Sequence, residues 1–185
     1  MRDELFIRGE VPMTKSEVRS ISISKLELSK DSVLYDVGAG TGSVSIEAAL
    51  SMAEGTVYAI EKKNEAIELI YKNIEKFSTS NVIVTEGEAP EALLNLPVPT
   101  HAFIGGTSGN MDSVLDLLLN KNPDIRIVIN VIALESLQDV MDWLKKKQIE
   151  AEIVHVQISK AKTAGRYHMM MGNNPVYVVS FGGNT

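Results

Sequence analysis

A glycine-rich turn between a buried strand and a helix constrains this chain more than any other segment. The turn, Asp36-Val37-Gly38-Ala39-Gly40-Thr41-Gly42, continues the apolar run that begins at residue 33 and leads into a helix from Ser43. Glycines at this spacing let the backbone approach a ligand closely and adopt dihedral angles that other residues avoid. Glu61 ends the next apolar segment, where an acid can accept hydrogen bonds from ribose hydroxyls. Together the turn and the acid predict a Rossmann-like α/β fold with a nucleoside cofactor.

The spacing of the glycines indicates which cofactor binds. The pattern is G-x-G-x-G, and Ser43 stands where the last glycine of the dinucleotide pattern G-x-G-x-x-G belongs. A carboxylate at Asp36 would repel a pyrophosphate but can hold an ammonium group. S-adenosylmethionine has an ammonium group, a ribose and no phosphate, and its carboxylate suits the amide-rich turn and the helix N-terminus. We therefore expect S-adenosylmethionine, rather than a turn that only packs, with contacts at Asp36, Gly38, Ala39, Gly40, Thr41, Gly42 and Glu61.

Composition narrows the function classes. The chain has 185 residues, of which 44% are hydrophobic, so we expect a single domain over residues 1–185. A net charge of −6 disfavours general nucleic-acid binding, which depends on neutralising phosphates. There is no cysteine, which excludes disulfides and thiolate-bound metals, and the three histidines show no metal-ligand spacing. With no segment resembling a signal peptide or a membrane span, we expect a cytoplasmic protein without metal, membrane or nucleic-acid partners.

The charge is unevenly spread along the chain. Residues 153–185 contain no Asp or Glu but include Lys160, Lys162 and Arg166. A locally basic stretch on an acidic protein favours an anion site. A solvated loop whose lysines bind nothing explains the pattern about as well.

The pattern of apolar segments predicts the architecture. Thr14-x-x-Glu17 reads as a capping box, so a helix should run from about Lys15 to Leu26 within an N-terminal helical segment of about 12–28. Strands then alternate with helices, and two late strands, 153–158 and 176–181, should pair antiparallel at the sheet edge. We therefore predict the class I methyltransferase fold, a seven-stranded, mostly parallel sheet with an antiparallel last strand.

Loops at the carboxyl ends of parallel strands are expected to form the ligand site. Glu88 and Ala89 follow the third strand and should lie near the adenine, although an ordinary solvent loop is the competing interpretation for Glu88. Gly105, Gly106 and Thr107 follow the fourth strand and should border the transferable methyl group. Met169-Met170-Met171 should belong to the core or to an apolar substrate surface. No residue is assigned a catalytic role.

Further motifs surround the glycine turn along nearly the whole chain. They are Phe6-x-Arg8, Pro12-Met13-Thr14-Lys15-x-Glu17-Val18-Arg19, Gly87-x-Ala89-Pro90, Phe103-Ile104-Gly105-Gly106, Leu134-Glu135 and Asn174-Pro175-Val176. With this set, the chain resembles the decarboxylating precorrin (cobalt-precorrin-6B) C15-methyltransferases of cobalamin biosynthesis. These are the stand-alone CbiT-type enzymes, which are similar to the C-terminal domain of the CobL-type precorrin-6Y methyltransferases.

The resemblance implies methylation of carbon 15 of a precorrin, coupled to decarboxylation of the ring-C acetate. It places cofactor contacts at Thr14, in the turn from Gly38 to Gly42, at Glu61 and at Ala89. It also implies a homotetramer and a possible functional pairing with a separate precorrin C5-methyltransferase. The acetate and propionate groups of such a substrate would suit the cations Lys15, Arg19, Lys160, Lys162 and Arg166.

This chemistry requires little from the protein beyond positioning. An electron-rich carbon of the macrocycle attacks the sulfonium methyl, and departure of carbon dioxide replaces a proton abstraction. Three alternatives stay open at this stage. They are a class I methyltransferase acting on RNA or another small molecule, a non-catalytic adenosylmethionine-binding module, and a nucleotide-dependent dehydrogenase.

Overall fold

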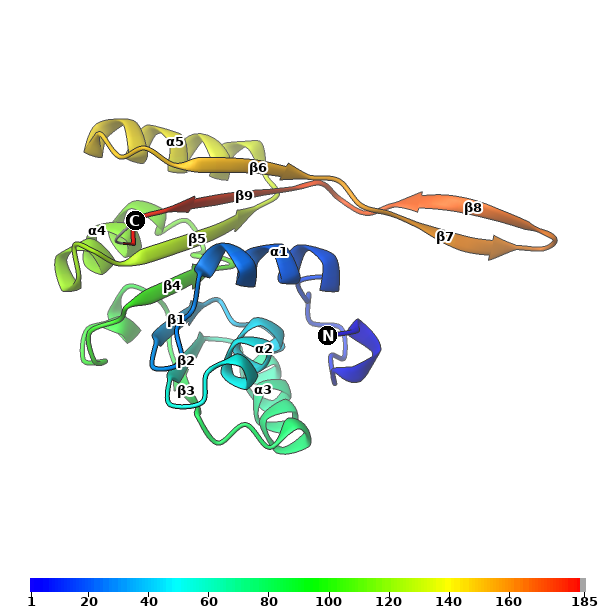
Figure 1. Cartoon of the computed structure of the whole chain (residues 1–185), viewed down its shortest axis with the longest axis horizontal. Coiled ribbons are helices and arrows are strands. Elements are labelled where there is room, and N and C mark those ends of the chain that lie inside the picture. Colours follow the sequence, from blue (N-terminus) through cyan, green and yellow to red (C-terminus); the bar gives the residue numbers. More distant parts are fainter. Residues whose placement is uncertain (184–185) are drawn as a thin grey trace.

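A central sheet of seven strands organises the protein, and its order is β3-β2-β1-β4-β5-β9-β6. The computed structural model describes residues 1–183 (Figure 1). Strands β1 to β5 run parallel, whereas β9 is antiparallel to both of its neighbours. The strands are β1 Val33–Val37, β2 Thr56–Glu61, β3 Val82–Glu86, β4 His101–Ile104, β5 Arg126–Val131, β6 Glu152–Val156 and β9 Val176–Phe181. This topology confirms the predicted fold class, including the antiparallel last strand.

Helices cover both faces of the sheet. Helices α1 Ser16–Leu26, α2 Ser43–Ser51 and α3 Asn64–Phe77 contribute buried residues to one core cluster, and α4 Met111–Lys121 and α5 Leu134–Lys147 to the other. Two short 3₁₀ turns, Asp3–Leu5 and Glu91–Leu93, complete the helical elements of residues 1–183. Residues 127–129 of the central strand β5 are fully buried. A continuous apolar run is what a strand covered on both faces requires.

A β-hairpin projects from the body between β6 and β9, and the sequence did not predict it. Its strands, β7 Ser159–Ala164 and β8 Tyr167–Gly172, form a separate two-stranded sheet that extends well away from the other elements (Figure 1). Every residue of both strands is exposed. Met169, Met170 and Met171 are 57%, 65% and 53% exposed, so the expectation that they belong to the core is wrong for this chain.

The predicted capping box at the start of α1 does not form. The helix begins one residue later than expected, with Lys15 as its N-cap and no side-chain cap bond. The carboxylate of Glu17 pairs instead with Lys160 Nζ at 2.8 Å, where β7 leaves the body. A contact between segments far apart in sequence therefore replaces the local one.

None of the helices within residues 1–183 combines the length and the apolar character needed to span a bilayer. Across the same residues, no three His, Cys, Asp or Glu side chains are grouped as a metal ion would require.

Candidate functional site

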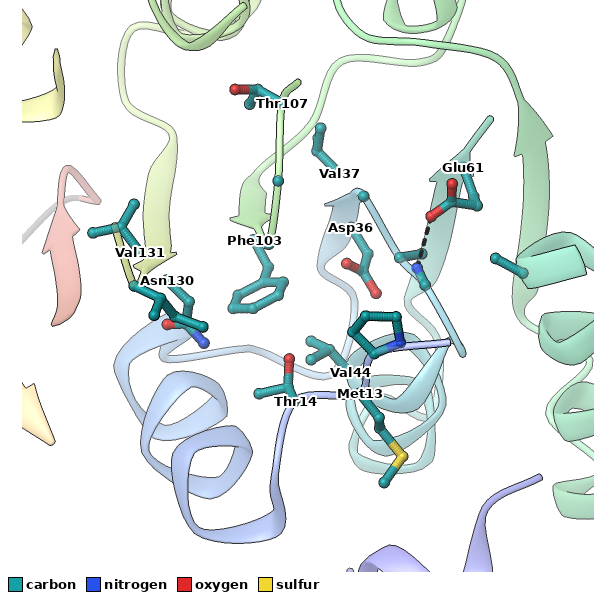
Figure 2. A pocket seen from close by; sticks show the side chains of 18 of the residues that line it. Met13, Thr14, Asp36, Val37, Val44, Glu61, Phe103, Thr107, Asn130 and Val131 are labelled. Carbon is teal, nitrogen blue, oxygen red and sulfur yellow. Dashed lines mark hydrogen bonds between the residues drawn. The ribbon is translucent and has the colours of Figure 1, made fainter. Parts of the chain in front are cut away.

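A cavity of about 930 Å³ lies at the carboxyl ends of the parallel strands. Its wall is built from the glycine turn after β1, the end of β2, the loops after β3 and β4, and the end of β5. The segment 11–15, just before α1, forms a further side (Figure 2). In an open α/β sheet this is the position at which ligands bind.

The turn after β1 requires glycine for two reasons. Gly38, Gly40 and Gly42 have φ angles of +75°, +57° and +74°, in the left-handed region that other residues avoid. A Cβ atom on Gly38 would also lie 2.7 Å from the carbonyl oxygen of Gly106, in the loop after β4. The two loops therefore pack backbone against backbone, and together they form one surface of the cavity.

Glu61 is held in place by backbone amides at the end of β2. Its Oε2 accepts a hydrogen bond of 2.9 Å from the amide of Gly40, and its Oε1 accepts bonds of 2.9 and 3.0 Å from those of Lys62 and Lys63 (Figure 2). The side chain lines the cavity, and the residue is 9% exposed. Each carboxylate oxygen has two acceptor positions. The amides thus orient Glu61 and leave one acceptor position, on Oε2, for a ligand hydroxyl.

Asp36 is a buried acid in the cavity wall with one oxygen free. Its Oδ2 accepts a hydrogen bond from the Ser45 hydroxyl, while its Oδ1 has no partner within residues 1–183. Burial raises the pKa of Asp36 from 3.8 to about 7; the bonds from Ser45 oppose this rise and the charge of Glu61 adds to it. A cation beside Oδ1 would favour the ionised form. The cavity therefore offers a place for a ligand ammonium group.

Glu88 and Ala89, in the loop after β3, both line the cavity. Lys62 Nζ lies 2.7 Å from Glu88 Oε1, and this hydrogen bond lowers the pKa of the Glu88 carboxyl. Since Lys62 directly follows Glu61, the two acids border the same end of the cavity.

The family assignment follows from the whole length of the chain. The family described as precorrin methyltransferase domain matches residues 5–181.

The chain belongs to the precorrin methyltransferase family.

Individual relatives agree with this assignment. The chain is 41% identical over 181 residues to a probable decarboxylating cobalt-precorrin-6B C(15)-methyltransferase from Pyrobaculum calidifontis, covering 96% of this chain and 93% of the relative. It is 39% identical over 183 residues to the decarboxylating cobalt-precorrin-6B C(15)-methyltransferase of Salmonella typhimurium, covering 97% and 94%. The family predicted from the sequence motifs is thereby confirmed.

Solved structures extend the likeness to three dimensions. The precorrin-6y C5,15-methyltransferase from Geobacter metallireducens superposes with a TM-score of 0.93 at 34% identity, covering 98% of this chain and 97% of that one. A SAM-dependent O-methyltransferase from Thermotoga maritima, at 14% identity, superposes with a TM-score of 0.77 over 94% of this chain and 67% of its own. This second likeness concerns the fold alone, which is the predicted class I methyltransferase fold.

The predicted cofactor residues of this precorrin methyltransferase family member divide into two groups. Most of them line the cavity, namely Thr14, Asp36, Gly38, Ala39, Gly40, Glu61, Glu88 and Ala89, together with the positioning candidates Gly105, Gly106 and Thr107. Thr41 and Gly42 do not line it. Thr41 is 1% exposed, and Gly42 is the N-cap of α2. These two residues belong to the turn but lie on the side that faces away from the cavity.

Arg19 serves the structure and does not face the cavity. Its fully buried guanidinium donates to Glu47 Oε2 at 2.6 Å and to Asp3 Oδ1 at 3.2 Å. It also donates to the carbonyl oxygen of Thr14 at 2.6 Å and lies 4.8 Å from the centre of the Phe6 ring. The expectation that Arg19 binds substrate is corrected on this ground, because no solvent or ligand reaches its charge. Arg19 instead fixes the segment that carries Thr14.

Of the remaining predicted cations, only Lys15 lines the cavity. Lys15 borders both the cavity and a smaller adjacent pocket, which Lys160 also lines. Lys160 is already paired with Glu17. Lys162 and Arg166 belong to the projecting hairpin and do not line the cavity, because the hairpin leads them away from the body (Figure 1).

Asn130 is a cavity residue that sequence reasoning did not select. It lies near the end of β5 with Val131, on the side of Phe103 and Thr14 and across from Glu61 (Figure 2). Its one sequence signal is that an amide interrupts the almost wholly apolar run 125–131.

Replacing Arg19 tests its structural role. Arg19→Met removes the donor from Asp3, from one oxygen of Glu47 and from two carbonyl groups, those of Met1 and Thr14, and removing one partner of a buried ion pair costs about 3–5 kcal/mol. We expect a loss of this size in the free energy of unfolding, measured by urea titration. The exposed Arg8→Met serves as control and should change the stability by less than about 0.5 kcal/mol. Equal stability of the two variants would contradict the role assigned to Arg19.

Proposed function

We propose that this protein is an S-adenosylmethionine-dependent methyltransferase that methylates carbon 15 of a precorrin and decarboxylates its ring-C acetate, in cobalamin biosynthesis. The substrate is cobalt-precorrin-6B or its metal-free counterpart. The observation that carries the proposal is the joint presence of Asp36, the glycine turn and Glu61 in one cavity, in a chain related over its whole length to enzymes of that name.

The side chains in the cavity fit the chemical groups of S-adenosylmethionine. Glu61 would accept a ribose hydroxyl through Oε2, and the loop at Glu88 and Ala89 would border the adenine. The buried Oδ1 of Asp36, which has no partner within residues 1–183, would accept a hydrogen bond from the ammonium group of the cofactor. The positive charge of that group would balance the charge of the buried carboxylate. When bound, the cofactor supplies an electrophilic methyl group.

The protein contributes positioning to the reaction. Gly105, Gly106 and Thr107 line the cavity after β4, and a Cβ atom on Gly106 would meet no atom within 4 Å. This open space would admit a flat macrocycle beside the methyl group. The substrate carbon is itself the nucleophile, and loss of carbon dioxide releases the electrons that a base would otherwise free by removing a proton. Holding donor and acceptor in line is thus the main task of the protein.

A product assay tests this function. Incubation with methyl-labelled S-adenosylmethionine and cobalt-precorrin-6B should yield a product that has gained one methyl group and lost one carbon dioxide, as measured by mass spectrometry. Glu61→Ala should weaken cofactor binding and raise the KM for S-adenosylmethionine about tenfold or more, because it removes a buried acceptor of a ribose hydroxyl. Methyl transfer to RNA in place of the precorrin, or methylation without loss of carbon dioxide, would contradict the proposal.

The affinity for S-adenosylmethionine should depend on pH through Asp36. With a pKa of about 7 in the free protein, this carboxyl is largely protonated at pH 6 and cannot pair with an ammonium group. As the pH falls below 7, the affinity should therefore decrease by up to about tenfold per pH unit. Titration calorimetry at several pH values measures this. Asp36→Asn should bind weakly and remove this dependence; a wild-type affinity that is constant between pH 5.5 and 7 would refute the assignment.

We also propose that the protein forms a homotetramer, as the family resemblance implies. The hairpin β7–β8 supports assembly, because an isolated two-stranded hairpin is at best marginally stable in water. Tyr167, Met169, Met170 and Met171 are each more than half exposed. The hairpin β7–β8 (the arm) therefore presents an apolar surface that another subunit can cover. A cytoplasmic location and a functional pairing with a separate precorrin C5-methyltransferase stay predictions from the sequence.

Light scattering after size-exclusion chromatography measures the assembly. The wild-type protein should have a mass of about four times the 20.2 kDa chain. Met170→Glu places a charge on the exposed arm and should yield smaller species. Met141→Glu, on the exposed side of α5, should leave the mass unchanged. A monomeric wild-type protein, or an unchanged mass for Met170→Glu, would contradict the tetramer or the role of the arm.

A further inference from the structure

In the side-chain amide of Asn130, the oxygen has a hydrogen-bond partner and the nitrogen has none within residues 1–183. Its Oδ1 lies 3.0 Å from the Ser22 hydroxyl of α1, and its Nδ2 is buried without a hydrogen-bond partner within residues 1–183. The side chain lines the cavity, opposite Glu61 and next to Phe103 and Thr14 (Figure 2). The free amide group therefore belongs to the wall of the proposed active site.

The Ser22 hydroxyl holds the oxygen end of the Asn130 amide. The hydroxyl has a single proton and lies 3.0 Å from both Asn130 Oδ1 and the carbonyl oxygen of Val18. That carbonyl already accepts the backbone amide of Ser22 through the helical i to i−4 bond. Because the Val18 carbonyl keeps its backbone bond in either case, donation of the hydroxyl proton to Asn130 Oδ1 leaves neither of these two oxygens without a donor. This bond turns the two N–H groups of Nδ2 away from Ser22.

A free amide in this place has an energetic cost. A buried donor without a partner costs about 1–3 kcal/mol, and native proteins carry few of them. The neighbouring residues 127–129 of β5 are apolar and fully buried, whereas Asn130 is partly buried and lines the cavity. A polar residue at this point is explained by a partner that arrives with the ligand.

We propose that Asn130 Nδ2 donates a hydrogen bond to a carboxylate of a bound ligand, with Ser22 as the positioning residue that orients the amide. The inference rests on the proposed function, which provides two carboxylates, the amino-acid carboxylate of S-adenosylmethionine and an acetate of the precorrin. Thr14 and Lys15 line the same cavity and add a hydroxyl and a cation, which also suit a carboxylate.

Four variants separate this role from a structural one. Asn130→Leu keeps the branching and the number of side-chain heavy atoms but removes the donor, whereas Asn130→Asp replaces the donor by an acceptor with negative charge. Ser22→Ala removes the orienting hydroxyl, together with its contact to the Val18 carbonyl. Asn120→Leu makes the same chemical change on the exposed side of α4 and is the matched control.

Three ligands identify which carboxylate is bound. Calorimetry gives the affinities for S-adenosylmethionine and for decarboxylated S-adenosylmethionine, which lacks the carboxylate. Absorbance titration gives the affinity of the S-adenosylhomocysteine complex for cobalt-precorrin-6B without any turnover. The thermal unfolding temperature of each variant is recorded in parallel.

We expect Asn130→Leu to weaken one carboxylate ligand by about ten- to a hundredfold, the loss of a hydrogen bond to a charged group. Asn130→Asp should weaken it further through repulsion, and Ser22→Ala severalfold, with unfolding temperatures close to that of the wild type. If the cofactor carboxylate is the partner, the loss appears with S-adenosylmethionine and disappears with its decarboxylated form. If the precorrin acetate is the partner, only the precorrin titration changes.

Two results would overturn the inference. The first is an Asn130→Leu variant that binds both S-adenosylmethionine and the precorrin within twofold of the Asn120→Leu control. The second is an Asn130→Asp variant that binds as well as the wild type, because the free end of the amide would then be an acceptor. Failure of the proposed function looks different, since the wild type itself would then bind S-adenosylmethionine and neither bind nor convert the precorrin.

Discussion

The architecture of the cavity depends on the close approach of two loops at the centre of the sheet. The turn after β1 and the loop after β4 touch through Gly38 and the carbonyl of Gly106, at a distance that excludes any side chain on Gly38. This contact holds the ends of neighbouring strands together and leaves a hollow beside them. From the same turn, the amide of Gly40 reaches across to Glu61 at the end of β2. Three strands of the parallel sheet are thus joined at their carboxyl ends by one backbone contact and one amide-to-carboxylate hydrogen bond, and these contacts shape the ligand site.

Features encoded in short sequence segments could be predicted, whereas features that depend on distant segments could not. The glycine turn and Glu61 carry their chemistry in their spacing, and the structure places both in the cavity. Arg19 was misassigned because its partners, Asp3, Glu47 and the carbonyl of Thr14, are brought to it only by folding. The sequence also marks Asn130 only weakly, as one amide in an almost wholly apolar run. Its significance requires knowing that Ser22 lies beside it.

In the basic C-terminal stretch, the fold separates cations that are close together in the sequence. Its three cations are close in sequence, yet only Lys160 lies at the body, where it pairs with Glu17. Lys162 and Arg166 are carried outward on β7 and the following turn. The absence of acids in this stretch therefore concerns the exposed hairpin more than the cavity.

Helix α1 supports both sides of the cavity at once. Arg19 holds the segment with Thr14 from one position on the helix, and Ser22, less than one turn further along, holds the amide of Asn130. A small shift or rotation of α1 would move both contacts in the same step. Both walls of the cavity are therefore anchored to one helix, and a substitution that displaces α1 should alter both walls together. Helix α1 is thus a shared support for the part of the cavity that holds Thr14 and the part that holds Asn130.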